Sequence, residues 1–207
     1  MRRPLVSVIT PTYQRAELLD GAILDVRAQT YARLEHVVVV DGPDEDSLIV
    51  CERASATADA TRDLVYTELG RNWSTFLPNA YVAAPATVGM LLASGDYQMW
   101  LADDERMTPD HIDGLVKALE RSGADFAYSR VEMYRAEAPH ARWIIGTDPP
   151  VCGQITNVLY RAEVLKLGLY VVGDQFTSDW ATIERWIKGG ATWAFVDRVT
   201  LTHRADR

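Results

Sequence analysis

Three consecutive acids, Asp103, Asp104 and Glu105, follow an apolar run of strand length over residues 97–101. In an open α/β sheet, side chains just beyond the carboxyl end of a strand project into the ligand site. Carboxylate oxygens are ligands that magnesium and manganese ions take, and a metal held there can also bind a diphosphate. Taken alone, the acids fit a solvated acidic turn better than a metal site, so the rest of the chain has to decide.

Other polar residues lie at the ends of predicted elements. Asp41 follows an all-valine strand end over residues 36–40, where a carboxylate can bind the base or ribose of a nucleotide. An ordinary turn or helix-capping role for Asp41 weighs equally. Asp179 lies at or just before the start of a predicted helix, where capping is the simplest role, although Ser178 could serve instead. The lone His203 near the chain end fits an exposed side chain.

The elements that position these residues begin with a β-α-β unit. An uncharged, β-rich run over 5–10 and the run 36–40 predict two strands, and apolar residues at helical spacing over 18–26 predict the helix between them. The connection is far longer than a hairpin, so the two strands are expected to be parallel. The first strand leads into the turn 11–15, which carries a hydroxyl, an aromatic ring and a cation.

The rest of the chain predicts a single α/β domain. A helix is expected to start with Thr108 as N-cap, Pro109 at the first helical position and Asp110 in the first turn, and to end at Gly123. The proline-containing region 136–153 is expected to be less regular and open to an acceptor. The other predicted helices cover residues 46–62, 82–93, 155–167 (ended by Gly168) and 181–188, the other strands 63–69, 125–135, 192–196 and 199–202, and a loop covers 70–74.

Composition indicates a soluble chain with one sizeable core. Its 207 residues are too few for two ordinary domains and a linker. No apolar run approaches bilayer-spanning length and the first residues lead into a strand, so a cytoplasmic protein is expected. The net charge of −8 argues against broad binding to nucleic acid or anionic membranes, although a local basic patch stays open. Cys51 and Cys152 lack partners at zinc spacing and are expected to be buried free thiols.

Six motifs in order now give the chain a resemblance to a known family. They are Val-Ile-Thr-Pro-Thr-Tyr-Gln-Arg at 8–15, Ala-Gln-Thr-Tyr at 28–31, Val-Val-Asp-Gly at 39–42, Ala-Ser-Gly-Asp-Tyr at 93–97, Leu-Ala-Asp-Asp at 101–104 with Pro109, and Asp179-Trp180 with Gly190. Each motif is weak alone, but their order is specific. The chain resembles the family-2 glycosyltransferases of the GT-A fold, nucleotide-sugar-dependent enzymes that usually invert the anomeric centre.

The resemblance implies a role for each candidate residue. It implies a nucleotide-sugar site formed by Pro11, Thr12, Tyr13, Arg15, Asp41 and Asp103, a divalent metal site at Asp104 and His203, and Asp179 as the catalytic base. The fold implied is a single-domain, Rossmann-like GT-A domain with a mostly parallel sheet flanked by helices. Residues 1–104 are expected to form its nucleotide-sugar-binding half and residues 105–207 its acceptor-side half.

Two departures from the family pattern affect these expectations. Ala102 replaces the first acid of the D-x-D motif, so a ribose contact is missing or is supplied by Asp103. The frequent Arg-Asn before a family glycine reads Ala-Thr-Val at 86–88, ahead of Gly89, which removes a polar contact to the donor.

The expected function is a metal-dependent, inverting sugar transfer from a nucleoside-diphosphate sugar to an acceptor hydroxyl. Mn²⁺ or Mg²⁺ is the implied cofactor and a UDP-sugar the favoured donor class. Two alternatives stay open: a nucleotidyltransferase on a related fold, and a catalytically degenerate sugar-nucleotide-binding module, which Ala102 would favour. The acceptor, the sugar and a possible homodimer are left open as well.

Overall fold

The computed structural model describes residues 3–57, 62–77, 82–170 and 178–205. In order, its elements are β1 (Val6–Thr12), α1 (Ala16–Arg27), β2 (Leu34–Val40), α2 (Glu45–Ser55), β3 (Arg62–Glu68), α3 (Trp73–Phe76), α4 (Ala83–Leu92), β4 (Tyr97–Trp100), β5 (Glu105–Met107), α5 (His111–Ser122), β6 (Phe126–Arg135), β7 (Ala138–Ile145), β8 (Leu159–Arg161), a 3₁₀ helix (Ala162–Leu167), α6 (Ser178–Lys188) and β9 (Trp193–Arg204).

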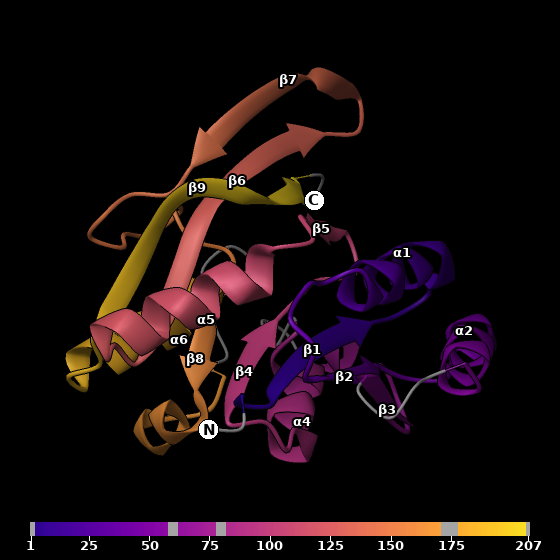
Figure 1. Cartoon of the computed structure of the whole chain (residues 1–207). Helices are drawn as coiled ribbons and strands as arrows, with labels where there is room; N and C mark the ends of the chain where they lie inside the picture. Colours follow the sequence, from indigo (N-terminus) through magenta and orange to yellow (C-terminus); the bar gives the residue numbers. More distant parts are fainter. Residues whose placement is uncertain (1–2, 58–61, 78–81, 171–177, 206–207) are drawn as a thin grey trace.

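The strands of these described residues form one mixed sheet in the order β3-β2-β1-β4-β8-β6-β9-β5, with β7 added beside β6 (Figure 1). The first four strands are parallel, as the β-α-β pattern predicted. In the other half, β8 runs antiparallel to both β4 and β6, whereas β6 and β9 are parallel. The expected α/β class with helices on a Rossmann-like sheet is confirmed.

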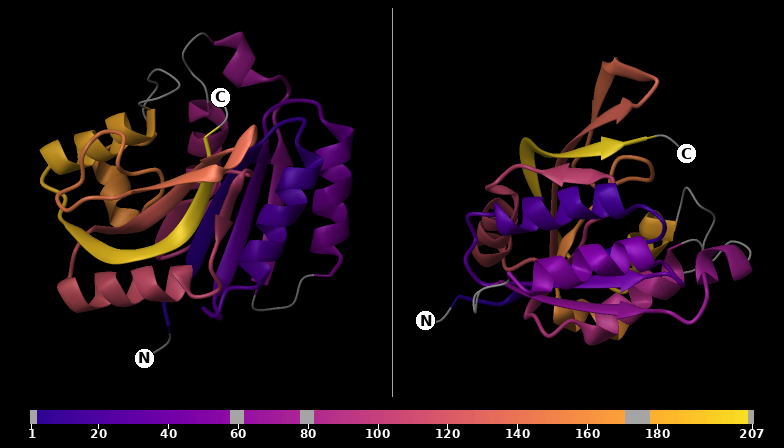
Figure 2. Two further views of the ribbon diagram at one scale, coloured as in Figure 1. Left: turned by 90° about the horizontal axis from the view of Figure 1, so that it is seen from above. Right: turned by 90° about the vertical axis from the view of Figure 1, so that its right-hand side faces the viewer.

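Helices cover both faces of the sheet, and the valine run of β2 shows why (Figure 2). Successive side chains of a strand point to opposite faces. Val37 and Val39 therefore pack with α4, while Val38 and Val40 pack with α1 and α2. A strand that is buried on both faces needs no polar alternation, which is why this run is uniformly apolar.

Two corrections concern the chain after the acidic residues. Residues 105–107 form the short strand β5, because their backbone pairs with residues 201–203 of β9. The following helix, α5, therefore begins at His111, and the Thr108 hydroxyl donates to the Asp110 carboxylate at 2.8 Å instead of capping the helix. The predicted end at Gly123 is confirmed, with φ of 72° in the left-handed region that glycine favours.

A larger correction concerns residues 155–167, which do not form one helix. Residues 159–161 form β8, which is inserted between β4 and β6, and only then does a 3₁₀ helix continue to the predicted end near Gly168. The apolar run at 158–160 is fully buried. A short buried run of this kind does not distinguish a central strand from a helix by its periodicity.

The expected irregular region is also more ordered than predicted. Residues 138–145 form β7, which makes a hairpin with β6 that projects from the body of the domain (Figure 1). Most of β7 is exposed on both faces, so its sequence carries no apolar alternation that would reveal a strand.

The other elements differ from the predictions at their edges. The end of the predicted loop 70–74 belongs to the single turn α3, which covers residues 73–76, and the two strands expected near the chain end form one bent strand, β9. Cys51 is buried as expected, but Cys152 is exposed. In the described part of the chain, no helix is both long and apolar enough to cross a lipid bilayer.

Candidate active site

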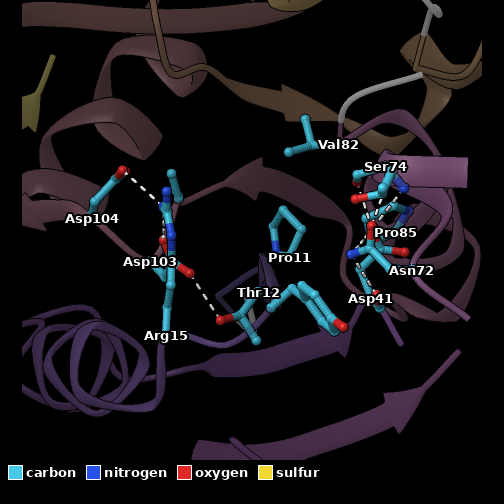
Figure 3. Close-up of a pocket in the computed structure, with 13 residues that line it drawn as sticks. Pro11, Thr12, Arg15, Asp41, Asn72, Ser74, Val82, Pro85, Asp103 and Asp104 are labelled. Carbon is cyan, nitrogen blue, oxygen red and sulfur yellow. Dashed lines mark hydrogen bonds and ion pairs between the residues drawn. The ribbon is translucent and has the colours of Figure 1, made fainter. Parts of the chain in front are cut away.

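The adjacent, parallel strands β1 and β4 bring the first turn and the acidic turn together. Ile9 pairs with Trp100, so the residues that follow each strand lie side by side at the carboxyl edge of the sheet. A cavity of about 230 Å³ opens there (Figure 3), and its lining residues are Pro11, Thr12, Tyr13, Arg15, Asp41, Asn72, Ser74, Thr75, Val82, Pro85, Ala102, Asp103 and Asp104. Seven of the nine site residues expected from the sequence therefore line one cavity.

One end of this cavity holds an acid pair that is bridged by a cation. Nη1 of Arg15 lies 3.0 Å from Oδ1 of Asp103 and 3.1 Å from Oδ2 of Asp104. The Thr12 hydroxyl donates to Oδ2 of Asp103 at 2.8 Å. Both acids are buried, so the paired charges are shielded from water on most sides.

Burial and charge act against each other in this cluster. Burial is the largest cause that raises the pKa of Asp103 above its ordinary value; Arg15 opposes this shift, and the neighbouring Asp104 reinforces it. Burial alone would lower the pKa of Arg15, but the two carboxylates outweigh it and raise that pKa. The guanidinium therefore stays charged and partly neutralises the acids.

Asp104 has the clearest capacity to accept a metal ion. Its Oδ1 is buried and has no hydrogen-bond partner among the described residues, and an unpartnered carboxylate oxygen is a ligand that hard divalent cations take. Within the described residues, no cluster of three or more His, Cys, Asp or Glu side chains could hold a metal by itself. A cation bound here would need further oxygens from a ligand or from water.

The opposite end of the cavity is organised around Asp41 (Figure 3). Its carboxylate accepts hydrogen bonds from the Trp73 and Ser74 backbone N–H groups, both at 3.0 Å, and from the Ser74 hydroxyl at 2.5 Å. Asn72 adds a side-chain bond at 3.2 Å. Asp41 thus holds the start of α3 against β2 by accepting from its first backbone N–H groups, although the N-cap residue of α3 is Asn72. This is a structural role of the kind that the sequence left open beside nucleotide binding.

Gly42, just after β2, allows the backbone at Asn72 to approach closely. Its φ is 121°, and a Cβ at this position would lie 2.5 Å from the backbone nitrogen of Asn72. The contact brings Asn72, Ser74 and Thr75 to the cavity wall. The sequence analysis placed Asn72 and Ser74 in the loop 70–74 without assigning either side chain a role, and it assigned none to Thr75, because their positions depend on a contact across thirty residues of chain.

The two remaining expected residues, Asp179 and His203, line an adjoining cavity of about 50 Å³. This smaller cavity shares Pro11, Val82 and Ala102 with the first one, so the two have a common wall. Asp179 lies in the first turn of α6, and the Tyr170 hydroxyl donates a hydrogen bond to its carboxylate.

His203 is an internal member of β9 and is largely buried, not an exposed terminal histidine. Its Nδ1 lies 3.1 Å from Oε1 of Glu105. His203 and Glu105 both line the smaller cavity, and the pairing of Glu105 with His203 places this histidine beside the residue that follows Asp104, its expected partner at the metal.

Glu105 is a further residue near the site to which the sequence assigned no role of its own. Its side chain is only 3% exposed, and Oε2 accepts from the Ala102 backbone N–H at 3.0 Å and from Nδ2 of Asn157 at 3.3 Å. Together with His203, these contacts fix the turn that carries Asp103 and Asp104. The only signal in the sequence was its membership of the acidic run.

Comparison with known proteins identifies the family of this chain. Residues 7–172 match the family model described as Glycosyl transferase family 2. The chain belongs to this family. This confirms the family resemblance, and the match includes every residue that lines the first cavity.

Two curated relatives are also named as glycosyltransferases. The chain is 27% identical over 122 residues to the glycosyltransferase GlyA of Streptococcus pneumoniae, covering 59% of this chain and 16% of that protein. An uncharacterized glycosyltransferase of Rickettsia typhi is 26% identical over 118 residues, covering 57% of this chain and 33% of the other. The chain thus spans a third or less of the length of these two curated relatives.

Two solved structures support the GT-A fold. The mannosyltransferase PcManGT of Pyrobaculum calidifontis, in complex with GDP-Man and Mn²⁺, aligns with a TM-score of 0.75 at 20% identity, over 100% of this chain and 59% of that one. TarS of S. aureus in complex with UDP aligns with a TM-score of 0.73 at 14% identity, over 98% of this chain and 61% of that one. This chain therefore matches about three fifths of each structure.

Proposed function

We propose that this chain is the catalytic domain of a glycosyltransferase that moves a sugar from a nucleoside-diphosphate sugar to an acceptor hydroxyl, with inversion at the anomeric carbon. The observation that carries the proposal is the common wall of the two cavities. It joins the acid pair Asp103 and Asp104 to the carboxylate of Asp179 through Pro11 and Ala102. A donor whose diphosphate lies near the acid pair would extend its sugar toward Asp179.

The first cavity suits a nucleotide at both of its ends. The Asp41 end offers the amide of Asn72 and the hydroxyls of Ser74 and Thr75, which can contact polar groups of a base or ribose. The Arg15 end offers a guanidinium, which binds phosphate well. All residues that line this cavity come from the first 104 of the chain, in line with the proposed nucleotide-sugar-binding half.

The metal-binding part of the proposal rests on Asp104. Its unpartnered Oδ1 fits a Mn²⁺ or Mg²⁺ ion, with the remaining ligands coming from diphosphate oxygens and water. When bound, such an ion would neutralise the negative charge that develops on the leaving nucleoside diphosphate. His203 would act from the neighbouring cavity, oriented by Glu105, and would contact a ligand that spans both cavities.

Asp179 is the proposed general base. Its carboxylate would take the proton from the acceptor hydroxyl as that oxygen attacks the anomeric carbon from the face opposite the leaving group. Tyr170 would hold one oxygen of this carboxylate in place through its hydrogen bond. The residues beyond 104 that surround Asp179 would then form the acceptor-side half.

The test is to identify the released product with a panel of nucleotide sugars, including UDP-GlcNAc and GDP-Man, in the presence of Mn²⁺. Release of UDP or GDP together with a glycosylated acceptor supports the proposal. Release of pyrophosphate would identify a nucleotidyltransferase instead. Donor binding without any transfer or hydrolysis would identify a degenerate binding module, the alternative that Ala102 suggests.

Two substitutions separate the proposed roles. Asp179→Asn should keep donor binding but reduce transfer about 10²- to 10⁴-fold, the usual contribution of a general base. Asp104→Asn should remove the part of donor binding that depends on Mn²⁺, measured by calorimetry with and without EDTA. Asp46→Asn, an exposed change in α2, is the matched control and should alter neither property. Near-native turnover by Asp179→Asn would remove Asp179 from the mechanism.

A further inference from the structure

The guanidinium of Arg15 occupies the position between two carboxylates that a cation would take. One nitrogen, Nη1, contacts both Asp103 and Asp104, at 3.0 Å and 3.1 Å. Two acids that are close together repel each other when both are ionised, and a shared cation relieves that repulsion. Arg15 therefore supplies the positive charge that the buried acid pair requires in this structure (Figure 3).

The partners differ in their freedom to move. The side chains of Asp103 and Asp104 are each 4% exposed, whereas that of Arg15 is 43% exposed. Asp103 is also held by Thr12, and both acids lie in the turn that Glu105 fixes. The acids are thus held in place by contacts with Thr12 and with the turn. The guanidinium is the more exposed partner, so it can move away from the acids without unfolding that turn.

One carboxylate oxygen of Asp104 is not used by Arg15. Arg15 contacts Oδ2 of Asp104, whereas Oδ1 of the same carboxylate is buried and has no hydrogen-bond partner among the described residues. A buried, unpartnered carboxylate oxygen is costly to maintain. A divalent ion that uses this oxygen would satisfy it, but it would lie next to the guanidinium, and the two positive charges would repel each other.

We infer that Arg15 is a resident counter-cation that a divalent metal ion must displace from Asp103 and Asp104. This inference rests on the proposed metal-assisted function. The displaced guanidinium stays on the wall of the same cavity, because Arg15 lines it. There it becomes free to bind the phosphate groups of the donor, so that metal entry exposes an anion-binding side chain. Arg15 thus couples metal binding to donor binding.

The test measures Mn²⁺ binding alone, by electron paramagnetic resonance of the free ion, with no donor present. Arg15→Gln removes the competing cation and should bind Mn²⁺ about tenfold more tightly than the wild type, within the usual range of coupling between two ligands. Arg15→Lys keeps the charge but lacks the planar fork, and should lie between the two. Arg53→Gln removes an arginine from an exposed ion pair with Asp20 and should leave Mn²⁺ affinity unchanged.

Thermal unfolding gives a second, independent measurement. Without Arg15 the buried acids have no neutralising partner, so saturating Mn²⁺ should raise the Tm of Arg15→Gln more than that of the wild type. The proposal is overturned if Arg15→Gln binds Mn²⁺ no more tightly than the wild type, or if neither protein binds it. Transfer from a nucleotide sugar by the wild type, assayed in parallel, shows whether such a result also affects the proposed function.

Discussion

Glu105 offers the sharpest test of how the acidic turn is held. Replacing it by alanine removes one buried carboxylate that accepts hydrogen bonds from Ala102 N, Asn157 Nδ2 and His203 Nδ1. Hydrogen bonds to a charged group each contribute about 1.5–3 kcal/mol, and a donor left buried and unpaired adds a desolvation cost. Because Nδ2 of Asn157 also donates to the Trp100 carbonyl oxygen and keeps that partner in the variant, we expect the lower part of this range. The total loss of unfolding free energy is about 3–5 kcal/mol.

The assay is urea unfolding followed by circular dichroism, at pH 7 and without metal. A loss of this size corresponds to a decrease in Tm on the order of 10 °C for a domain of this length. Glu52→Ala, on the exposed face of α2, removes a carboxylate at the surface and should change stability by less than about 0.5 kcal/mol. If Glu105→Ala is as stable as this control, the turn does not depend on Glu105 and the reasoning is refuted.

Two further predictions concern the body of the domain. Burial lowers the pKa of His36 from 6.5 to about 3, so the unfolded chain binds more protons below pH 6.5 and stability falls as the pH decreases from there. At pH 5.5 this costs about 1.4 kcal/mol; His36→Gln should reduce the loss seen in pH-dependent unfolding curves, whereas His140→Gln, at an exposed site, should not. A Cβ on Gly89 would lie 2.3 Å from Cγ2 of Ile9, so Gly89→Ala should destabilise the domain by about 1–3 kcal/mol in urea titrations. Gly114→Ala, within α5 where the added Cβ has space, should instead stabilise the domain by about 0.5–1 kcal/mol. If both substitutions changed the unfolding free energy in the same direction, the packing of α4 on β1 would be contradicted.

Much of the candidate site was predictable because it follows from strand polarity. Parallel strands present their carboxyl ends at one edge of the sheet, and β1, β2 and β4 are each recognisable as short apolar runs that stop at polar residues. Thr12, Asp41 and Asp104 therefore had to lie near each other once these three runs were taken as strands of one parallel sheet. The cavity that they line agrees with that expectation.

Other features could not be predicted because they depend on long-range pairing. Nothing local distinguishes β8 from a helix, since its apolar side chains are buried in the cores on both faces of the sheet while its backbone pairs with β4 and β6. The strand β5 exists because β9 provides it with backbone partners almost a hundred residues away. The exposed hairpin strand β7 lacks the apolar pattern on which strand prediction depends.

The sequence by itself determined the family, the parallel half of the sheet and the chemical types of residue at its carboxyl edge, because local patterns of apolar and polar residues encode them. Only the tertiary structure decided which of these residues are paired with each other. It places Arg15 between Asp103 and Asp104, and it pairs His203 with Glu105. It also turns Glu105 inward to hold the acidic turn. The reason is physical. The sequence shows that a side chain is a carboxylate, but the groups that pair with it come from distant parts of the chain and are brought next to it only by folding.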